Sequence, residues 1–469
     1  MKGKLWTVLA VMVILSLGLA ACAPATPVVV EREVPVTVVK EVPVEVEKEV
    51  PVEVVKEVVV TPTPVPEAPT PVPEPRTLYI GGTMSLTGPY AEDTAAVLAG
   101  YEDYAQYVNE TKNLAPWREE EFPANVTLEV MWRDDELKAA KMLPIYDELK
   151  AAGMLVYRIG SSDSAYALMG RLEEDRMGAV TMATGPYLLS PPRTIFTQYP
   201  IYTDEAAVVA EWFLENWKET RKPRFAFLTA DSPFGRSVEI PELKAYLEEL
   251  GYEVVGSQYV PMVPTAPPTT QLLWLKENGV DLTFGCMINP GSQPTIKEAV
   301  RLGMGPHLDY KITFGFALPS HLQVFAPAMG ELGNGVVLAG GYPSNWPTVS
   351  EDDVEGIKFC KELQDTYRPN DPVTHIMYPH GVVEAMIQVE ALRLAMLEVP
   401  VEELKPVDVL EYGFYMIKNL STGGITSTPL TYGPGDIEGI NEIRLQQVQE
   451  GKIVDLGTGP ARGIYTPIK

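Results

Sequence analysis

The sequence predicts an α/β protein whose folded part consists of two lobes with parallel sheets. From residue 77 onward, short apolar strands alternate with helical segments, which is the pattern of parallel βαβ units. The alternation pauses at 198–203 and then starts again. The chain has 469 residues, 46% of them hydrophobic, which is enough for two cores. Because ligands bind beyond the carboxyl ends of parallel strands, we expect a site in the cleft between the lobes.

The individual elements follow from apolar runs that stop at glycines or polar turns. In the first block, strands are expected at 77–82, 126–132, 155–159 and 179–182, and helices at 91–111, 136–152 and 164–174. In the second block, strands are expected at 224–228, 253–260 and 282–286, and helices at 204–218, 238–250, 269–278 and 293–302. These lengths favour parallel sheets covered by helices.

The N-terminus predicts export. Lys2 and Lys4 precede an apolar run at 5–19, which is too short for an ordinary membrane span and is typical of a secretory signal. The run ends in Leu-Ala-Ala-Cys, which resembles the lipobox of bacterial lipoproteins. This resemblance implies a signal peptide at 1–21, lipidation of Cys22, and an extracytoplasmic protein of the cell envelope that is anchored to a membrane by lipid. The alternative is a plain signal peptide with an incidental cysteine.

Residues 22–76 predict a stalk. The tetrad Glu-Val-Pro-Val begins at Glu33, Glu41 and Glu49, and valine occupies alternate positions. The proline in each repeat excludes a helix and blocks continuous strand pairing. Together with the Pro-rich run that follows, the repeats favour a semi-rigid spacer of polyproline II type. Pairing of the valines with other copies or with a wall component is the alternative.

Composition and motifs argue against several function classes. A net charge of -26 makes nucleic acid a poor partner, because phosphates would be repelled. The four histidines (His307, His321, His375 and His380) show no metal-binding spacing, and no phosphate-binding loop or nucleophile motif occurs. We therefore expect no enzymatic activity, no catalytic residue, no metal and no cofactor.

Several short motifs, in order, resemble one family. They are the turn at 85–90, the strand end at 159–162, Ala183-Thr184, the loop at 231–235, and the closing segments at 428–434 and 446–454. Together they are similar to the leucine/isoleucine/valine-binding proteins of ABC transporters. The resemblance implies a type I periplasmic-binding fold, in which two Rossmann-like lobes are joined by a three-crossover hinge. Placed on this sequence, it gives lobe 1 at 77–202 plus 317–424 and lobe 2 at 203–316 plus 425–469.

The resemblance also implies a ligand site. In this family, hydroxyls and helix N-termini hold the carboxylate of an amino acid, and those roles are carried to Ser161 and Thr184. Ser161 and Ser162 could instead simply cap the helix that follows. The candidate ligand contacts are Thr87, Tyr90, Ser161, Ser162, Ala183, Thr184, Tyr202, Phe234 and Asn289. Tyr90 and Tyr202 could equally be half-buried core residues.

One departure from the family concerns the ammonium group of the ligand. The family supplies a carboxylate from the loop that is 287–293 here, and this loop contains no acid. A buried ammonium would lack compensation. Asp93, Asp163 or Asp231 could substitute, although each could equally cap a helix or turn. A neutral amide, an aromatic or other carboxylate, or a modified amino acid therefore fits at least as well as a branched-chain amino acid.

The resulting prediction is a solute-binding lipoprotein that closes on a small molecule and delivers it to an ABC permease. The alternative is a ligand-sensing lipoprotein that reports to a regulatory partner. The expected partners are a small-molecule ligand, permease subunits and the membrane that holds the anchor, and the folded part is expected to be monomeric. Cys286 and Cys360 could form one disulfide, but the implied lobes separate them, so we expect two buried free thiols.

Overall fold

The structure, a computed structural model, describes residues 74–189 and 194–464. They belong to one of two structural units, Pro71–Lys469. The predicted signal peptide, Cys22 and nearly all of the predicted stalk lie outside the described residues, so those interpretations remain predictions. Among the described helices, none is both long and apolar enough to cross a membrane.

The first block forms one parallel layer. Its elements are β1 (Arg76–Met84), α2 (Ala91–Thr111), β2 (Val126–Asp134), α3 (Ala139–Ala151), β3 (Tyr157–Ile159), α4 (Ser162–Asp175), β4 (Ala179–Thr181), η1 (Pro186–Leu189) and β5 (Ile195–Thr197). β1 pairs with β2, and β3, β4 and β5 pair in sequence, all in parallel. β3 lies so close to β1 that a Cβ added to Gly82 would be 2.4 Å from the carbonyl oxygen of Arg158. Only a residue without a side chain permits this approach.

The second block builds a larger sheet. Its elements are α5 (Tyr202–Asn216), β6 (Arg224–Ala230), α6 (Pro233–Arg236), α7 (Pro241–Leu250), β7 (Glu253–Val260), α8 (Thr269–Glu277), β8 (Leu282–Gly285), α9 (Asn289–Arg301), β9 (Thr313–Phe316), η2 (Leu318–Ser320), α10 (Leu322–Met329), η3 (Gly330–Gly333) and β10 (Val337–Ala339). Within the described residues this sheet has seven strands in the order β14-β13-β10-β9-β8-β6-β7. Strands β6 to β10 are parallel, and β13 and β14 add antiparallel pairs at one edge.

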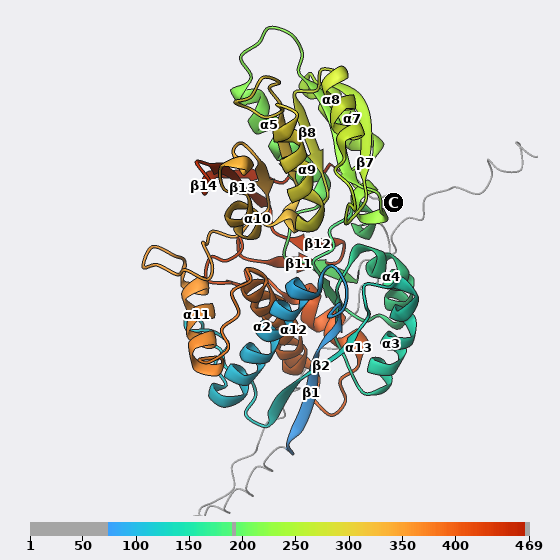
Figure 1. The fold of residues 1–469 in the computed structure, drawn as a ribbon. Coiled ribbons are helices and arrows are strands. Elements are labelled where there is room, and N and C mark those ends of the chain that lie inside the picture. The colour runs from blue at the N-terminus through green and yellow to red at the C-terminus, as the bar shows by residue number, and fades with distance from the viewer. Residues whose placement is uncertain (1–73, 190–193, 465–469) are drawn as a thin grey trace, which may run out of the picture. The chain divides into compact units, whose positions relative to one another are not determined.

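The remaining chain covers the first layer and then returns to the second sheet. Its elements are α11 (Glu355–Tyr367), α12 (Met377–Glu398), α13 (Pro406–Asp408), η4 (Val409–Gly413), η5 (Phe414–Met416), β11 (Thr431–Gly433), β12 (Asp436–Gly439), β13 (Glu442–Gln449) and β14 (Lys452–Pro460). The β11–β12 hairpin lies next to β5, and the hydroxyl of Tyr432 donates to the carbonyl of Thr197 at 2.9 Å. Figure 1 shows α12 beside α2, with which it packs.

The lobe boundaries predicted at 317 and 424 do not fit this pairing. β10 hydrogen-bonds to β9 and β13, so the chain stays with the second sheet until residue 339. The β11–β12 hairpin stays with the first layer until residue 439. We therefore propose crossings at 198–202, 340–342 and 440–442. Residues of all three segments line one small cavity, and the N–H of Gly340 donates to the carbonyl of Arg444 at 2.8 Å.

Most element predictions agree with the structure. The helix at 91–111 and the strand at 253–260 have the expected bounds. The helix expected at 136–152 begins only at Ala139, because Glu136 and Leu137 adopt left-handed backbone with φ of 53° and 56°. Their N–H groups donate to Asp134 and Asp135 at 2.8 and 2.9 Å, which holds the loop in this conformation.

The two cysteines of the described residues are free and buried, as expected. Cys286 follows β8 and Cys360 lies within α11. Burial raises the pKa of both thiols above the ordinary value, so neither is a reactive thiolate at neutral pH.

A buried ion pair joins the first layer to α12. Arg158 of β3 donates to Glu384 at 2.8 Å, and both side chains are 0% exposed. The guanidinium also donates to the carbonyl of Thr83 at 2.9 Å. A charge in such surroundings is tolerated only with its partner and its hydrogen bonds.

Replacing Glu384 with Ala should lower the free energy of unfolding by about 3–5 kcal/mol, because Arg158 would keep a buried charge without compensation. Urea titration followed by circular dichroism measures the change. The double variant Arg158→Met/Glu384→Leu, which removes both charges, should lose less than the single variant. Equal losses would show that packing, and not charge compensation, explains the effect.

Candidate functional site

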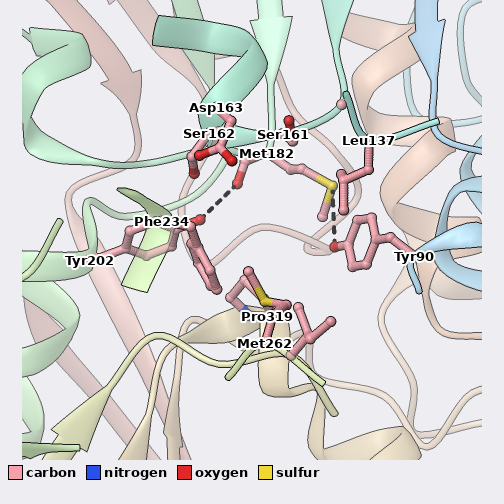
Figure 2. Close-up of a pocket in the computed structure, with 13 residues that line it drawn as sticks. Tyr90, Leu137, Ser161, Ser162, Asp163, Met182, Tyr202, Phe234, Met262 and Pro319 are labelled. Atoms are coloured by element: carbon pink, nitrogen blue, oxygen red, sulfur yellow. Dashed lines mark hydrogen bonds between the residues drawn. The ribbon is translucent and has the colours of Figure 1, made fainter. Parts of the chain in front are cut away.

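A small cavity lies where strands of both blocks end at their carboxyl edges, which is the predicted place for a ligand (Figure 2). Its volume is about 70 Å³, which suits a few water molecules or a small ligand. Thirteen residues line it: Tyr90, Leu137, Gly160, Ser161, Ser162, Asp163, Met182, Ala183, Tyr202, Phe234, Met262, Ile288 and Pro319.

One wall of the cavity is polar and belongs to the start of α4. Ser161 is the N-cap, and its hydroxyl accepts from the N–H of Ser164 at 3.2 Å, so the predicted capping role is confirmed. Ser162 and Asp163 follow in the first turn. The unpaired N–H groups and the dipole of a helix N-terminus attract polar groups of negative character to this wall.

The other walls are apolar or aromatic. The hydroxyls of Tyr90 and Tyr202 both turn to Met182, the first donating to Sδ at 3.5 Å and the second to the carbonyl at 3.4 Å. Phe234 packs edge-on against Tyr202, with ring centroids 5.5 Å apart. Figure 2 shows Met262 and Pro319 on the side of the cavity opposite to Ser161 and Ser162. The cavity therefore offers aromatic and thioether surface around one polar end.

Six of the predicted contacts line the cavity: Tyr90, Ser161, Ser162, Ala183, Tyr202 and Phe234. The structure places three others outside its lining. Thr87 is exposed, and its hydroxyl donates to Asp134 at 2.5 Å. Thr184 is fully buried beside the cavity, with its carbonyl accepting from the N–H of Tyr202 at 3.1 Å. Asn289 starts α9, and its amide donates to the carbonyl of His321 at 3.5 Å.

Six lining residues were not selected from the sequence: Leu137, Gly160, Met182, Met262, Ile288 and Pro319. Asp163 had been considered there as a possible partner for the ammonium group of a ligand. Gly160 lay within the motif at 159–162 and Asp163 directly follows it, so their position could be read from the sequence. Met262 and Pro319 come from a loop after β7 and from η2, where no local pattern indicates a direction toward the cavity.

Three of the four histidines form a cluster, in which the ring centroid of His321 lies 6.2 Å from that of His375 and 5.7 Å from that of His380. Nε2 of His321 and Nε2 of His375 lie 3.6 and 3.7 Å from Oδ1 of Asp93, which is one turn after Tyr90. His380 stacks on Tyr342 with ring centroids 3.7 Å apart. Within the described residues, no group of three or more His, Cys, Asp or Glu side chains is placed to hold a metal ion.

Burial dominates the protonation of this cluster. It raises the pKa of Asp93 from 3.8 to about 7 and lowers the pKa of His321 to about 3. It also lowers the pKa values of His375 and His380. The imidazoles are therefore uncharged at neutral pH, while Asp93 titrates there.

Comparison with protein families gives one match that covers most of the chain. The model described as "Periplasmic binding protein" matches residues 77–450. Comparison with curated proteins gave no match.

Solved structures share the fold at low identity. A branched-chain amino acid ABC transporter protein from Thermus thermophilus with bound valine is 20% identical, with 84% of this chain and 98% of that chain covered and a TM-score of 0.70. A fatty acid ABC transporter substrate-binding protein from Thermomonospora curvata is 19% identical, with coverage of 84% and 95% and a TM-score of 0.67. A solute-binding protein from R. palustris in complex with 4-hydroxybenzoate is 15% identical, with coverage of 82% and 97% and a TM-score of 0.65. These likenesses confirm the predicted α/β fold with parallel sheets.

The titration of Asp93 should be visible in stability. Because its pKa is raised in the folded state, the folded protein keeps a proton that the unfolded chain releases, so this group reduces wild-type stability as pH rises from about 4 to about 7. The unfolding free energy of the Asp93→Asn variant minus that of wild type should therefore be larger at pH 8 than at pH 5, by about 1 kcal/mol or more. Urea titrations of both proteins at the two pH values measure this, and an unchanged difference would contradict it.

Proposed function

Because the chain belongs to the periplasmic binding protein family, we propose that it captures a small ligand between its two lobes outside the cytoplasm and delivers it to an ABC import permease. The cavity at the carboxyl ends of the strands carries this proposal, since residues on both sides of the crossings line it: Ser161 and Met182 on one side, Phe234 and Ile288 on the other. A ligand that contacts both sides stabilises the closed arrangement over an open one.

The lining of the cavity indicates the ligand class. A small molecule with an apolar body and one polar end fits the aromatic and thioether walls and the start of α4. Valine, which one of the similar structures contains, has this design. 4-Hydroxybenzoate, which another contains, also has a carboxylate on an apolar body, with a hydroxyl at the opposite end of its ring. We therefore propose an amino acid, an amide or a related carboxylate as the ligand.

The proposed location and partners follow from the N-terminal residues and the family. Lipidation of Cys22 would anchor the protein to a membrane, and residues 22–76 would hold the binding unit at a distance from it. A permease that receives the ligand would then meet the binding unit at the same membrane. We propose that the folded part acts as a monomer.

Titration calorimetry tests the proposal. The chain from residue 23 onward is titrated with branched-chain and aromatic amino acids, their amides and aromatic acids, and saturable binding with one ligand per chain is expected. The ligand-loaded protein should then stimulate ATP hydrolysis by an ABC transporter whose permease and ATPase genes adjoin its own. Stimulation of a sensor kinase without any effect on the transporter would favour the sensing function instead.

Phe234 provides a test of the site itself. Its ring is 8% exposed and packs against Tyr202 within the cavity wall. Phe234→Ala should weaken ligand binding by about tenfold or more, because an aromatic wall is lost. Leu273→Ala, at an exposed position of α8, serves as the matched control and should bind as wild type does. Equal affinity of wild type and Phe234→Ala would place the ligand elsewhere.

A further inference from the structure

Asp163 is the one acidic or basic side chain among the described residues that line the cavity. It stands in the first turn of α4, directly after Ser162, and Figure 2 shows it on the same wall as the two serines. Apart from this carboxylate and the two serines, the lining is apolar or aromatic, and a carboxylate oxygen shielded from water in such a place needs a hydrogen-bond donor.

The helix does not need this carboxylate as a cap. Ser161 already occupies the N-cap position and accepts from the N–H of Ser164. Oδ1 of Asp163 is buried and accepts no hydrogen bond from any of the described residues. The capping role considered for Asp163 in the sequence is therefore filled by its neighbour.

No cation of the described residues neutralises Asp163 either, since burial is the one cause of its raised pKa and it forms no ion pair there. Arg158 donates to Glu384, to Thr83 and to the sulfur of Met182, behind the cavity wall. Burial raises the pKa of Asp163 above the ordinary value, and no cation offsets the effect. A donor that arrives with a ligand would supply the missing hydrogen bond.

We propose that Asp163 determines specificity by binding a hydrogen-bond donor of the ligand, either the ammonium of an amino acid or the NH2 group of an amide. This inference rests on the proposed function and names its substrate class. Asp163, on the first layer, would then bind the ammonium or NH2 group of the ligand, for which the loop at 287–293 provides no acid.

The neighbourhood of Asp163 narrows the ligand further. A carboxylate acceptor lies beside the N–H groups of a helix start, so the polar wall presents an acceptor next to donors. Amino acids and primary amides match it, because each carries a donor next to an acceptor. A simple carboxylate lacks the donor and would bring a second negative charge to Asp163. Simple acids should therefore bind more weakly than amino acids and amides, which narrows the ligand class proposed above to those two.

Matched pairs of ligands test the proposal by calorimetry at pH 7.5 on the chain from residue 23 onward. The pairs are valine with 3-methylbutanoate, leucine with 4-methylpentanoate, phenylalanine with 3-phenylpropanoate, and 3-methylbutanamide with 3-methylbutanoate. In at least one pair, the wild-type protein should bind the member with the N–H donor about tenfold or more tightly than the acid without it.

Asp163→Asn should reduce that preference to about threefold or less, because the NH2 group of the asparagine side chain can donate to the carboxylate of a simple acid. Asp163→Ser, which also places a residue suited to the first turn of a helix, should behave in the same way. This second variant is used if Asp163→Asn folds poorly. Glu174→Gln is the matched control: it removes one charge from an exposed position of the same helix and should keep the wild-type preference.

The relative affinities of the paired ligands decide whether Asp163 binds the donor. If the acids without a donor bind wild type as tightly as their partners, the proposal for Asp163 is overturned while the proposed binding function stands. If both Asp163 variants keep the wild-type preference, another group holds the donor and the proposal also fails. If no member of any pair binds, the proposal falls together with the proposed ligand class.

Discussion

The ion pair between Arg158 and Glu384 constrains the part of the molecule that carries the polar wall of the cavity. Both side chains are fully buried, so each is acceptable only in the presence of the other, and β3 must meet α12. A second polar contact joins the same helix to β1, because the side-chain amide of Gln388 in α12 hydrogen-bonds to both backbone groups of Gly81, at 2.8 and 3.2 Å. The strands β1 and β3 are thereby fixed against one helix.

The ion pair also reaches the cavity. The guanidinium of Arg158 lies 3.7 Å from the sulfur of Met182, and that residue in turn accepts from both cavity tyrosines. β3 leads within two residues to Ser161, which begins α4. The buried charges, the aromatic wall and the start of α4 therefore share one rigid support, which suits a site that must present donors and an acceptor in fixed positions.

The regular elements and the family could be read from the sequence, since the apolar strands and the ordered motifs are local signals. The strand at 253–260 and the position of Ser161 are examples. The lobe boundaries could not, because they were carried over from the family resemblance, whereas long-range strand pairing decides which sheet holds β10. The delayed start of α3 was also hidden, because it depends on carboxylates that bind their own loop. Long-range pairing and side-chain-to-backbone bonds leave little trace in local periodicity.

The two buried thiols make this protein convenient for spectroscopy. Cys286 and Cys360 are both inaccessible and protonated, so across the described residues the folded surface offers no sulfhydryl that reacts with a maleimide. One cysteine introduced into α4 and another into α8 would then be the sites that accept a fluorophore or a spin label in the folded unit. The distance between the two sheets could be followed in solution while the natural sulfur chemistry of the interior stays intact.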